Sequence, residues 1–374
     1  MRVLFLPAPA IGHAFPMVPL AWAFRAAGHD VLFITAGDGL AVAQAGLPVL
    51  DALPGRTTNQ LYAQFVHDVP ELFEPLPEGV DPVAGLNERK PSIVACWDPY
   101  VDAHLALAER VRPDLVVYDP IFGVGPLVAA TLGIPAAAYG FTLCRYPPEM
   151  LRELPAAVAF QRHGLKVPDE IPTIDLAPPS LVEGPPSPLQ MRYIPYNGGS
   201  VLPDWLLAAP ERPRLAVTFG SLEQAHGSGS LARLAAAAAG VDAEFVVASG
   251  EANPRRPDEL PPNVRIIGWT PLNALLPSCT AAIHHGGSSS ALTCCALGIP
   301  QLALPENFAD AMAEAQLLQA RGAAMVLHGE ELDAAVVREL LDDDKLRRVA
   351  GELKAEIAEL PSPADLVPRL VELP

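Results

Sequence analysis

Short aliphatic runs recur along the chain and are separated by stretches with helical patterning. In the first half these runs are 3–7, 31–35, 114–119 and 134–140. Continuous apolar runs between helices are typical of parallel strands that are buried on both faces of a sheet. We therefore predict an α/β fold for this half, with a doubly wound parallel sheet.

A second series of runs predicts a second domain of the same kind. It follows a stretch rich in Pro and Gly at about 178–213, which is typical of a linker. From Ile266 to Pro305 there is no Asp, Glu, Lys or Arg, as expected for buried strands. The strands predicted for this series are 214–220, 244–249, 264–269, 281–286, 300–305 and 323–328.

The length of the chain supports this division, because 374 residues exceed what one hydrophobic core usually holds. We expect an N-terminal Rossmann-like domain at 1–195 and a C-terminal Rossmann-like domain at 196–360, facing each other across a cleft. The charged tail is expected to end in a helix at 361–374 that packs back on the N-terminal domain.

Net charge and cysteine usage exclude several function classes. The formal net charge of −18 disfavours nucleic acid and anionic membranes as partners, and no cluster of Lys and Arg offsets it. Five cysteines without a CxxC pair predict reduced thiols and a cytoplasmic location. The N-terminus lacks a signal-peptide pattern, and Pro and Gly interrupt the charge-free run at 120–144, so we expect no membrane insertion.

The strongest local signal is a pair of histidines, two glycines and three serines at the junction of a predicted strand and helix. Glycines let the backbone approach an anion, and the first turn of a helix offers N–H groups and a positive dipole end. We expect the serines to cap the helix and to donate hydrogen bonds. The segment predicts a diphosphate cradle; the alternative is an ordinary strand-to-helix turn with the histidines in the core. The cradle residues are His285, Gly286, Gly287, Ser288, Ser289 and Ser290.

Two neighbouring turns support a nucleotide site. Gly220 and Ser221 follow the first strand of the second domain and offer a second phosphate donor. Trp269 ends another strand, where its indole either stacks on a nucleobase or closes the core. Each turn alone is unspecific, but together with the cradle they predict a nucleoside diphosphate as ligand.

In combination these motifs resemble those of glycosyltransferase family 1 enzymes of GT-B fold, particularly bacterial enzymes that attach nucleotide-activated deoxysugars to polyketides and related natural products. The resemblance implies a TDP-deoxysugar donor, a small hydrophobic acceptor, diphosphate contacts by Ser221, His285 and Ser290, and a base pocket with Trp269 and Thr270. It covers nearly the whole chain and rests on PAPAIGHAFPMVPLAWAFRAAGHDVLFIT, PDLVVYDP, MRYIPYNGG, VTFGS, GWTPLNALLPSC and HHGGSSSALTCCALGIPQLALP.

Gly12 and His13 follow the first strand and precede a helix that we expect to start near Phe15, which places an imidazole at the C-terminal edge of a parallel sheet. The resemblance implies that His13 is the general base that takes the proton of an acceptor hydroxyl. Unperturbed imidazole has a pKa of about 6.5, so it is mostly unprotonated at neutral pH. Asp119, at the end of another strand, is predicted to orient the ring; the alternative is a helix cap.

We expect transfer in a single displacement that inverts the anomeric centre, with no cofactor beyond the nucleotide sugar. No Asp-x-Asp follows a predicted strand, so we expect no metal ion. The Gly-x-Gly-x-x-Val at 123–128 contains a proline and does not fit an NAD(P) site. The alternatives are carbon glycosylation of an aromatic polyketide with Asp119 as base, a sugar-nucleotide epimerase, and a non-catalytic sugar-nucleotide-binding partner of another transferase. A homodimer or an activator protein is left open.

One segment departs from the family pattern. Relatives carry Asp-Gln shortly after the proline that ends the strand at 300–305, where the pair holds sugar hydroxyls. Here either Asp310 follows a one-residue insertion and Ala311 replaces its Gln partner, or Ala309 and Asp310 replace the pair. The loss of an amide fits a sugar with fewer hydroxyls. The alternative is that Glu306 or Asn307 makes the contact.

Two insertions, 54–91 and 141–178, are longer than ordinary loops and are predicted walls of an acceptor pocket. Aromatic side chains in or beside them either stack on a planar acceptor or fill the core. The acceptor contacts that we predict are Tyr62, Phe65, Trp97 and Phe141.

Overall fold

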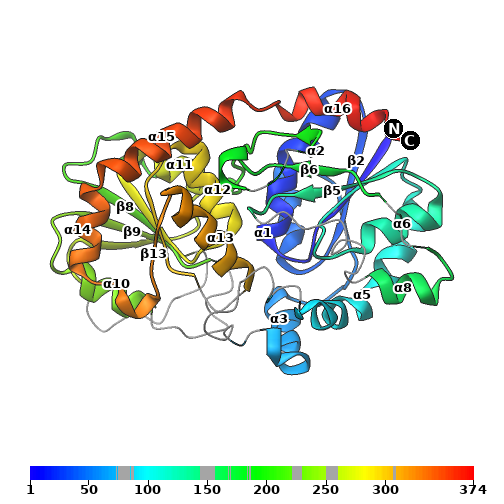
Figure 1. The fold of residues 1–374 in the computed structure, drawn as a ribbon, viewed down its shortest axis with the longest axis horizontal. Coiled ribbons are helices and arrows are strands. Elements are labelled where there is room, and N and C mark those ends of the chain that lie inside the picture. Colours follow the sequence, from blue (N-terminus) through cyan, green and yellow to red (C-terminus); the bar gives the residue numbers. More distant parts are fainter. Residues whose placement is uncertain are drawn as a thin grey trace. The chain divides into compact units, whose positions relative to one another are not determined.

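The chain forms two compact units, each built on a parallel β-sheet as predicted (Figure 1). Unit 1 comprises Met1–Pro179, Glu183–Arg192 and Leu360–Pro374, and unit 2 comprises Ser180–Val182 and Tyr193–Glu359. The structure is a computed structural model, and the residues that it describes are 1–72, 74, 85, 88–143, 156–166, 168, 170–182, 184, 187–220, 230–249, 260–305 and 309–374.

The described part of unit 1 contains a seven-stranded sheet in the order β3-β2-β1-β4-β5-β6-β7, with every neighbouring pair parallel. The four strands predicted for this half, β1, β2, β4 and β5, are confirmed. The remaining three are two or three residues long and were not predicted. The strands are β1 (Arg2–Leu6), β2 (Asp30–Thr35), β3 (Val49–Asp51), β4 (Leu115–Tyr118), β5 (Ala136–Gly140), β6 (Thr173–Asp175) and β7 (Leu189–Gln190).

Alternate side chains of β1 face opposite layers of helices. Leu4 and Leu6 pack in a buried cluster with side chains of α5 and α6. Phe5 faces the other way, stacked on Phe33 and edge-on to Phe24 of α2. On this second face α16 lies beside α2 (Figure 1). The described helices of unit 1 are α1 (Ile11–Ala14), α2 (Val18–Ala26), α3 (Thr58–Asp68), α5 (Lys90–Val111), α6 (Val124–Leu132), α8 (Ala156–Arg162) and α16 (Pro363–Val371).

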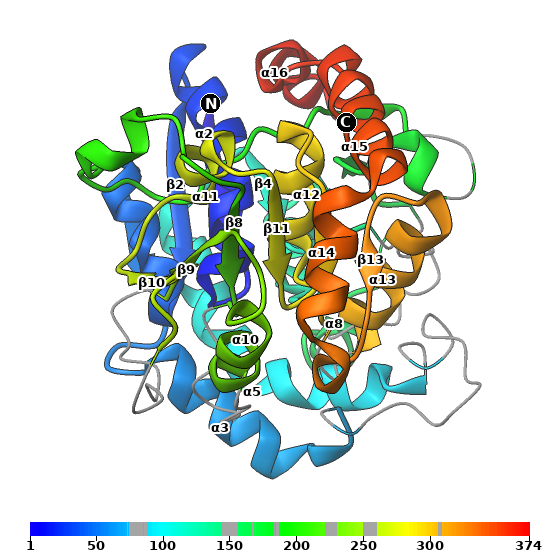
Figure 2. The ribbon, with the colours of Figure 1, turned by 90° about the vertical axis from the view of Figure 1, so that its left-hand side faces the viewer.

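The described part of unit 2 contains a six-stranded parallel sheet in the order β10-β9-β8-β11-β12-β13. All six strands predicted for this half are present, and each is shorter than the predicted run, which extends into the adjoining loops. Figure 2 shows β8 beside β11 at the centre of the sheet. The strands are β8 (Arg214–Thr218), β9 (Glu244–Ala248), β10 (Val264–Ile267), β11 (Ala281–His284), β12 (Gln301–Ala303) and β13 (Met325–Val326).

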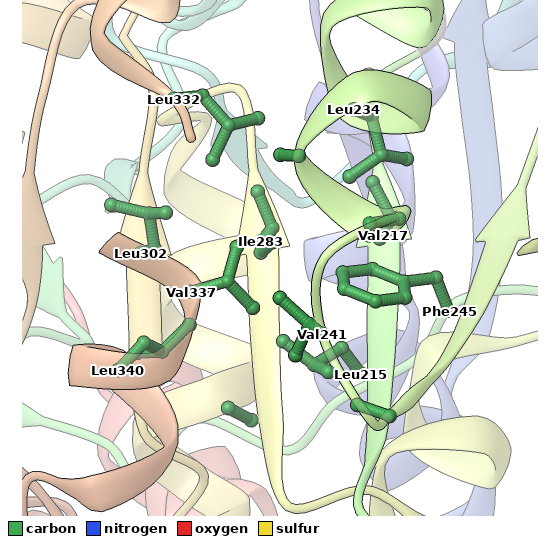
Figure 3. Close-up of a cluster of buried hydrophobic side chains, with 14 of the residues drawn as sticks. Leu215, Val217, Leu234, Val241, Phe245, Ile283, Leu302, Leu332, Val337 and Leu340 are labelled. Atoms are coloured by element: carbon green, nitrogen blue, oxygen red, sulfur yellow. The ribbon is translucent and has the colours of Figure 1, made fainter. Parts of the chain in front are cut away.

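The core of unit 2 lies between the sheet and two helices, α10 and α14. Figure 3 shows Leu215 and Ile283 of the sheet facing Leu234 and Val337 of these helices. The opposite face of the sheet packs on α11 and α12, and α15 lies beside α12. The described helices of unit 2 are α10 (Ser230–Ala238), α11 (Leu272–Leu275), α12 (Ser288–Leu297), α13 (Ala309–Arg321), α14 (Ala334–Asp342) and α15 (Asp344–Glu359).

Both sheets have a point at which the order of strand addition reverses. In unit 1 this point lies between β1 and β4, and in unit 2 it lies between β8 and β11. Loops that follow such a pair of strands leave the sheet in opposite directions, which opens a crevice where α/β proteins bind ligands. The loops after these four strands are therefore the places to look for functional side chains.

Two further expectations concern thiols and membranes. Within the ranges described, Cys279, Cys294 and Cys295 are free thiols, and Cys144 lies outside the described residues. No helix in the same ranges has the length and hydropathy of a membrane span.

Candidate active site

Two side chains from neighbouring strands meet at the reversal point of unit 1. Leu6 at the end of β1 pairs with Tyr118 at the end of β4, so the residues that follow start from adjacent positions at one edge of the sheet. His13 Nδ1 lies 2.6 Å from Asp119 Oδ2. The Asp119 side chain is 2% exposed, whereas that of His13 is 32% exposed. The structure brings together two residues that the sequence predicted as a pair, and we call them the dyad.

The hydrogen bonds of Asp119 indicate which nitrogen of His13 carries the proton. Asp119 Oδ1 accepts from Ile121 N at 3.0 Å, and Oδ2 accepts from Ala8 N at 3.4 Å. Backbone donors favour an ionised carboxylate, which has only acceptors. The proton in the 2.6 Å contact therefore lies on Nδ1 of His13. Nε2 is then the basic nitrogen of the ring.

His13 lies in a short helix, α1, which begins at Ile11. Our expectation of a loop at His13 and a helix start near Phe15 is therefore wrong. The N-cap residue of α1, Ala10, has no side chain that can cap the first turn. Asp38, in the 3₁₀ helix that follows β2, supplies the cap, because its Oδ1 accepts from Ile11 N at 2.9 Å. The helix was missed because its cap is remote in sequence.

Thr58, the first residue of α3, completes this arrangement. Thr58 Oγ1 accepts from Asp38 N at 2.8 Å, and it lies 2.7 Å from Asp38 Oδ1 and 3.0 Å from Pro9 O. We call Asp38 and Thr58 the clamp. Burial raises the pKa of Asp38, while hydrogen bonds with Thr58 and Ile11 and the charge interaction with His13 lower it. Sequence reasoning missed both residues; the available signal was an Asp between two glycines directly after the strand next to β1.

The second group of predicted residues lies at the reversal point of unit 2. His284 ends β11 and pairs with Thr218 at the end of β8. Gly220 and Gly286 follow these strands with φ angles of 81° and 87°, a region that favours glycine. A Cβ added at Gly286 would lie 3.1 Å from Pro305 Cα. The loop after β11 therefore depends on glycine for its conformation and for space.

The His285 ring packs against both loops. A Cβ added at Gly220 would lie 2.8 Å from His285 Nε2, and one added at Gly287 would lie 2.5 Å from the same atom. Burial lowers the pKa of His285 to about 4, an effect that hydrogen bonding to the Thr218 backbone partly offsets. Within the part of the chain that the structure describes, His285 Nδ1 is buried without a hydrogen-bond partner. The ring is therefore neutral at pH 7 and lies beside the start of α12.

α12 begins directly after the two glycines. Its N-cap is Gly287, which has no side chain, so our expectation of a serine at the cap is wrong. Ser288 Oγ donates instead to Glu314 Oε1 at 2.7 Å, and the Ser290 side chain is buried. The first turn of a helix has N–H groups without partners within the helix and a positive dipole end. This arrangement is able to bind a phosphate.

Comparison with family models identifies the family of the chain. Residues 22–220 match the model of the family described as erythromycin biosynthesis protein CIII-like, N-terminal domain, and residues 232–373 match that of its C-terminal domain. The chain belongs to this family.

Individual relatives show which activity the family carries. The elloramycin glycosyltransferase of Streptomyces olivaceus is 40% identical and aligns over 99% of this chain and 97% of its own. The crystal structure of glycosyltransferase SnogD from Streptomyces nogalater is 38% identical, with a TM-score of 0.81 over 100% of this chain and 99% of its own. Glycosyltransferase SsfS6 of Streptomyces sp. SF2575, complexed with thymidine diphosphate, is 34% identical, with a TM-score of 0.78 over 100% and 99%. The chain is a glycosyltransferase of GT-B fold, as the motifs implied.

The predicted base-pocket residues of this glycosyltransferase lie just before α11. Trp269 is 40% exposed, so it does not close the core. Its Nε1 donates to Asn197 O at 3.0 Å, and Asn197 Oδ1 accepts from Asn273 N at 3.0 Å. Thr270 Oγ1 donates to Gly268 O at 3.3 Å. The indole is therefore anchored by its edge, while part of its surface stays accessible for stacking.

The four predicted acceptor contacts occupy two places in unit 1 of the glycosyltransferase. Tyr62 and Phe65 are buried on α3, and Phe65 packs edge-on against Trp97 at 4.8 Å between ring centroids. Phe141, which follows β5, is edge-on to the His13 ring at 5.3 Å. Phe141 therefore lies at the dyad, whereas Phe65 and Trp97 belong to an aromatic cluster between α3 and α5. Their role in acceptor binding stays a prediction.

Some predicted donor contacts of the glycosyltransferase lie outside the described residues. These are Ser221, together with Glu306 and Asn307 of the segment that departs from the family pattern. Asp310 belongs to α13, but its side chain is also outside what the structure describes. Their roles in diphosphate and sugar binding stay predictions.

Proposed function

We propose that this glycosyltransferase transfers a deoxyhexose from a thymidine diphosphate donor to a hydroxyl of a small hydrophobic natural product, with inversion of the anomeric centre. The observation that carries the proposal is the 2.6 Å contact between His13 Nδ1 and Asp119 Oδ2. This contact makes Nε2 the basic nitrogen, on a side chain that is one third exposed. An unprotonated nitrogen on a partly exposed side chain is able to accept the proton of an acceptor hydroxyl.

His13 acts as the general base. Its Nε2 takes the hydroxyl proton while the hydroxyl oxygen forms a bond to the anomeric carbon. The bond between that carbon and the diphosphate oxygen breaks, and thymidine diphosphate leaves with the electron pair. Asp119 stabilises the imidazolium that forms, and a positioned base of this kind accelerates reactions by roughly 10²–10⁴-fold. Displacement in one step inverts the configuration without a covalent sugar-enzyme intermediate.

The cradle of unit 2 binds the diphosphate. Each interaction of a charge with a helix terminus contributes about 0.3–1 kcal/mol, and up to about 2 kcal/mol when partly buried. Several must therefore converge on the two phosphoryl groups, from the first turn of α12 and from His285. Because these donors also stabilise the negative charge of the leaving group, we propose a reaction without a metal ion. Turnover that is unchanged in excess chelator is the check.

Two comparisons support the choice of donor and acceptor. SsfS6, which is 34% identical, was solved with thymidine diphosphate. The elloramycin glycosyltransferase and the erythromycin biosynthesis family both belong, by their names, to natural-product synthesis. We favour transfer to oxygen over transfer to carbon because the basic nitrogen of His13 is suited to take the proton of a hydroxyl group.

The experiment combines ligand binding with turnover. Thermal unfolding is followed with TDP and with UDP, because a ligand specific for the folded state raises the melting temperature. The protein is then incubated with TDP-linked deoxyhexoses and a panel of polyketide aglycones, and the products are analysed by mass spectrometry and by NMR of the anomeric proton. We expect a shift with TDP and a product of inverted configuration.

Other outcomes discriminate the alternatives. No shift with TDP and no product would exclude the proposal. Conversion of the nucleotide sugar to free nucleotide and an isomerised sugar without an acceptor indicates an epimerase. Binding of TDP without turnover on any acceptor indicates a non-catalytic sugar-nucleotide-binding protein. A product in which the sugar is linked through carbon indicates that the enzyme is a carbon glycosyltransferase.

A further inference from the structure

The two adjacent histidines of the cradle have different surroundings. His284 is 1% exposed and pairs within the sheet with Thr218, whereas His285 lies beyond the end of β11. Burial, followed by the interaction with His285, lowers the pKa of His284 to about 4, so the ring is neutral at pH 7. A neutral imidazole has one N–H and one acceptor nitrogen. The neighbours of His284 determine which nitrogen is which.

The backbone of Gly286 settles this assignment. Its N–H donates to His284 Nδ1 at 3.1 Å, so Nδ1 is unprotonated and Nε2 carries the hydrogen. His284 Nε2 lies 2.8 Å from Gln301 Oε1, which accepts that hydrogen. Gln301 Nε2 then donates to Cys295 Sγ at 3.4 Å. The result is a directed chain of hydrogen bonds from the loop to β12 and α12, and its three side chains are each 1% exposed.

This chain restricts the loop that leads into α12. A backbone N–H that donates to the side chain two residues earlier forms a turn that Asn and Asp side chains ordinarily make. Here an imidazole makes it, and Gly286 takes a φ angle of 87°. The Gly286 N–H therefore points to His284 and does not face an anion. The N–H groups at the start of α12 remain as backbone donors for a phosphate.

We propose that His284 is a positioning residue for donor binding. It does not touch the diphosphate, but it holds the Gly286 amide and so places His285 and the first turn of α12 against the phosphoryl groups. This inference rests on the donor site proposed above. It removes the Gly286 N–H from the predicted diphosphate donors and gives the two histidines separate roles.

Two substitutions separate loop placement from core stability. His284→Asn keeps an acceptor for the Gly286 N–H, because an Asn side chain makes the same turn. Its shorter side chain does not reach Gln301, so the buried Gln301 Oε1 loses its hydrogen bond, which destabilises the fold. His284→Gln extends toward Gln301 but has no acceptor at the position of Nδ1. A purely structural role predicts that TDP affinity follows stability in these variants.

If His284 positions the loop, the less stable of the two variants should be the one that binds TDP more tightly. The Asn variant should unfold more easily than the Gln variant, yet bind TDP within about twofold of the wild type. The Gln variant should bind TDP at least about fivefold more weakly, the size expected for one lost hydrogen bond. Affinity is measured by calorimetry with TDP, and stability by urea unfolding. His328→Asn, which changes an exposed histidine of the same unit, is the control and should bind TDP as the wild type does.

The inference is overturned if affinity follows stability or if both variants bind like the wild type. A measurement without ligand tests the inference about His284 independently of the proposed function. NMR of protein labelled at the histidine ring nitrogens should show His284 with hydrogen on Nε2 and none on Nδ1. Hydrogen on Nδ1 refutes the inference even if TDP binds. If the tautomer is as stated but wild-type protein does not bind TDP, the donor site itself is wrong, and the role of His284 in donor binding fails with it.

Discussion

His13 and Asp119 are 106 positions apart in the sequence, yet Nδ1 of one and Oδ2 of the other are separated by 2.6 Å. They meet because β1 and β4 are neighbours in the sheet, although β2 and β3 lie between them along the chain. In unit 2 the same reversal brings Gly220, after β8, next to the ring of His285, after β11. Each of the two groups of candidate residues therefore follows from the strand order of its own unit.

Replacement of His13 tests the base. His13→Ala should lower turnover by roughly 10²–10⁴-fold, because the acceptor hydroxyl loses its proton acceptor. TDP affinity should change little, since the cradle residues belong to unit 2. Steady-state kinetics and calorimetry measure the two quantities. The control is His67→Ala on α3, whose side chain is 86% exposed, and which should retain full turnover. Wild-type turnover in the His13 variant would rule out its role as base.

Replacement of Asp38 tests the clamp. Asp38→Ala removes the cap of α1 and should lower turnover about ten- to a hundredfold, because small misplacement of a catalytic group is costly. Asp38→Asn keeps an oxygen that accepts from Ile11 N and should retain most of the turnover. The ratio of the two turnover numbers is the measurement. If the Ala and Asn variants are equally active, the clamp does not position His13.

Substitution at Gly287 tests the contact between the loop and His285. The φ angle of Gly287 is −67°, which any residue adopts, so alanine acts there through its Cβ alone. That Cβ would lie 2.5 Å from His285 Nε2 and must displace the ring. We expect TDP affinity to fall about tenfold or more, as several hydrogen bonds shift together. Gly351→Ala in α15, where no atom lies within 4 Å of the added Cβ, is the control and should leave affinity unchanged.

Because His104 is buried, we expect the free energy of unfolding to decrease at acid pH. It is fully buried on α5, and burial lowers its pKa to about 4. In the unfolded chain its pKa is about 6.5, so the unfolded state binds a proton first as the pH falls. The stabilisation is therefore fully present above about pH 6.5 and decreases as the pH falls toward 4, by about 2 kcal/mol between pH 7 and pH 5.

His104→Leu should flatten this dependence. The leucine does not titrate, so the variant should lose about 2 kcal/mol less than the wild type between pH 7 and pH 5. Urea unfolding at the two pH values measures the difference. His284 and His285 also have pKa values lowered to about 4 and add a dependence of the same sign in both proteins. Parallel pH profiles of variant and wild type would contradict the prediction.

The sequence predicted the long central strands better than the short outer ones. β1, β4, β8 and β11 are covered by helices on both faces, so each appears as a continuous apolar run. β3, β6 and β7 are two or three residues long, and β6 and β7 lie in Pro-rich segments that read as an insertion and a linker. Hydrophobic periodicity needs more residues than these strands contain.

The candidate site was predictable where local motifs define it, as at the cradle. The pairing of His13 with Asp119 was also predicted, because both residues follow strands of one parallel sheet, but other contacts with remote partners were not. Asp38 caps α1 from 27 positions away, and Ser288 donates to Glu314, 26 positions further on, rather than capping α12. The chain from Gly286 through His284 depends likewise on Gln301, a residue of another strand. Such pairings follow from the packed structure, and the local sequence does not identify the partner.

The helix that covers α2, α16, is synthesised long after α2 itself. α16 buries Leu366, Val367 and Leu370 and packs on α2, so unit 1 is closed by residues that follow all of unit 2 in the sequence. On the ribosome, α2 emerges without this cover, and at about 5–20 residues per second it waits roughly twenty to seventy seconds for α16 to be synthesised. The nascent chain therefore exposes an apolar surface of α2 that a chaperone is able to recognise until α16 has been synthesised.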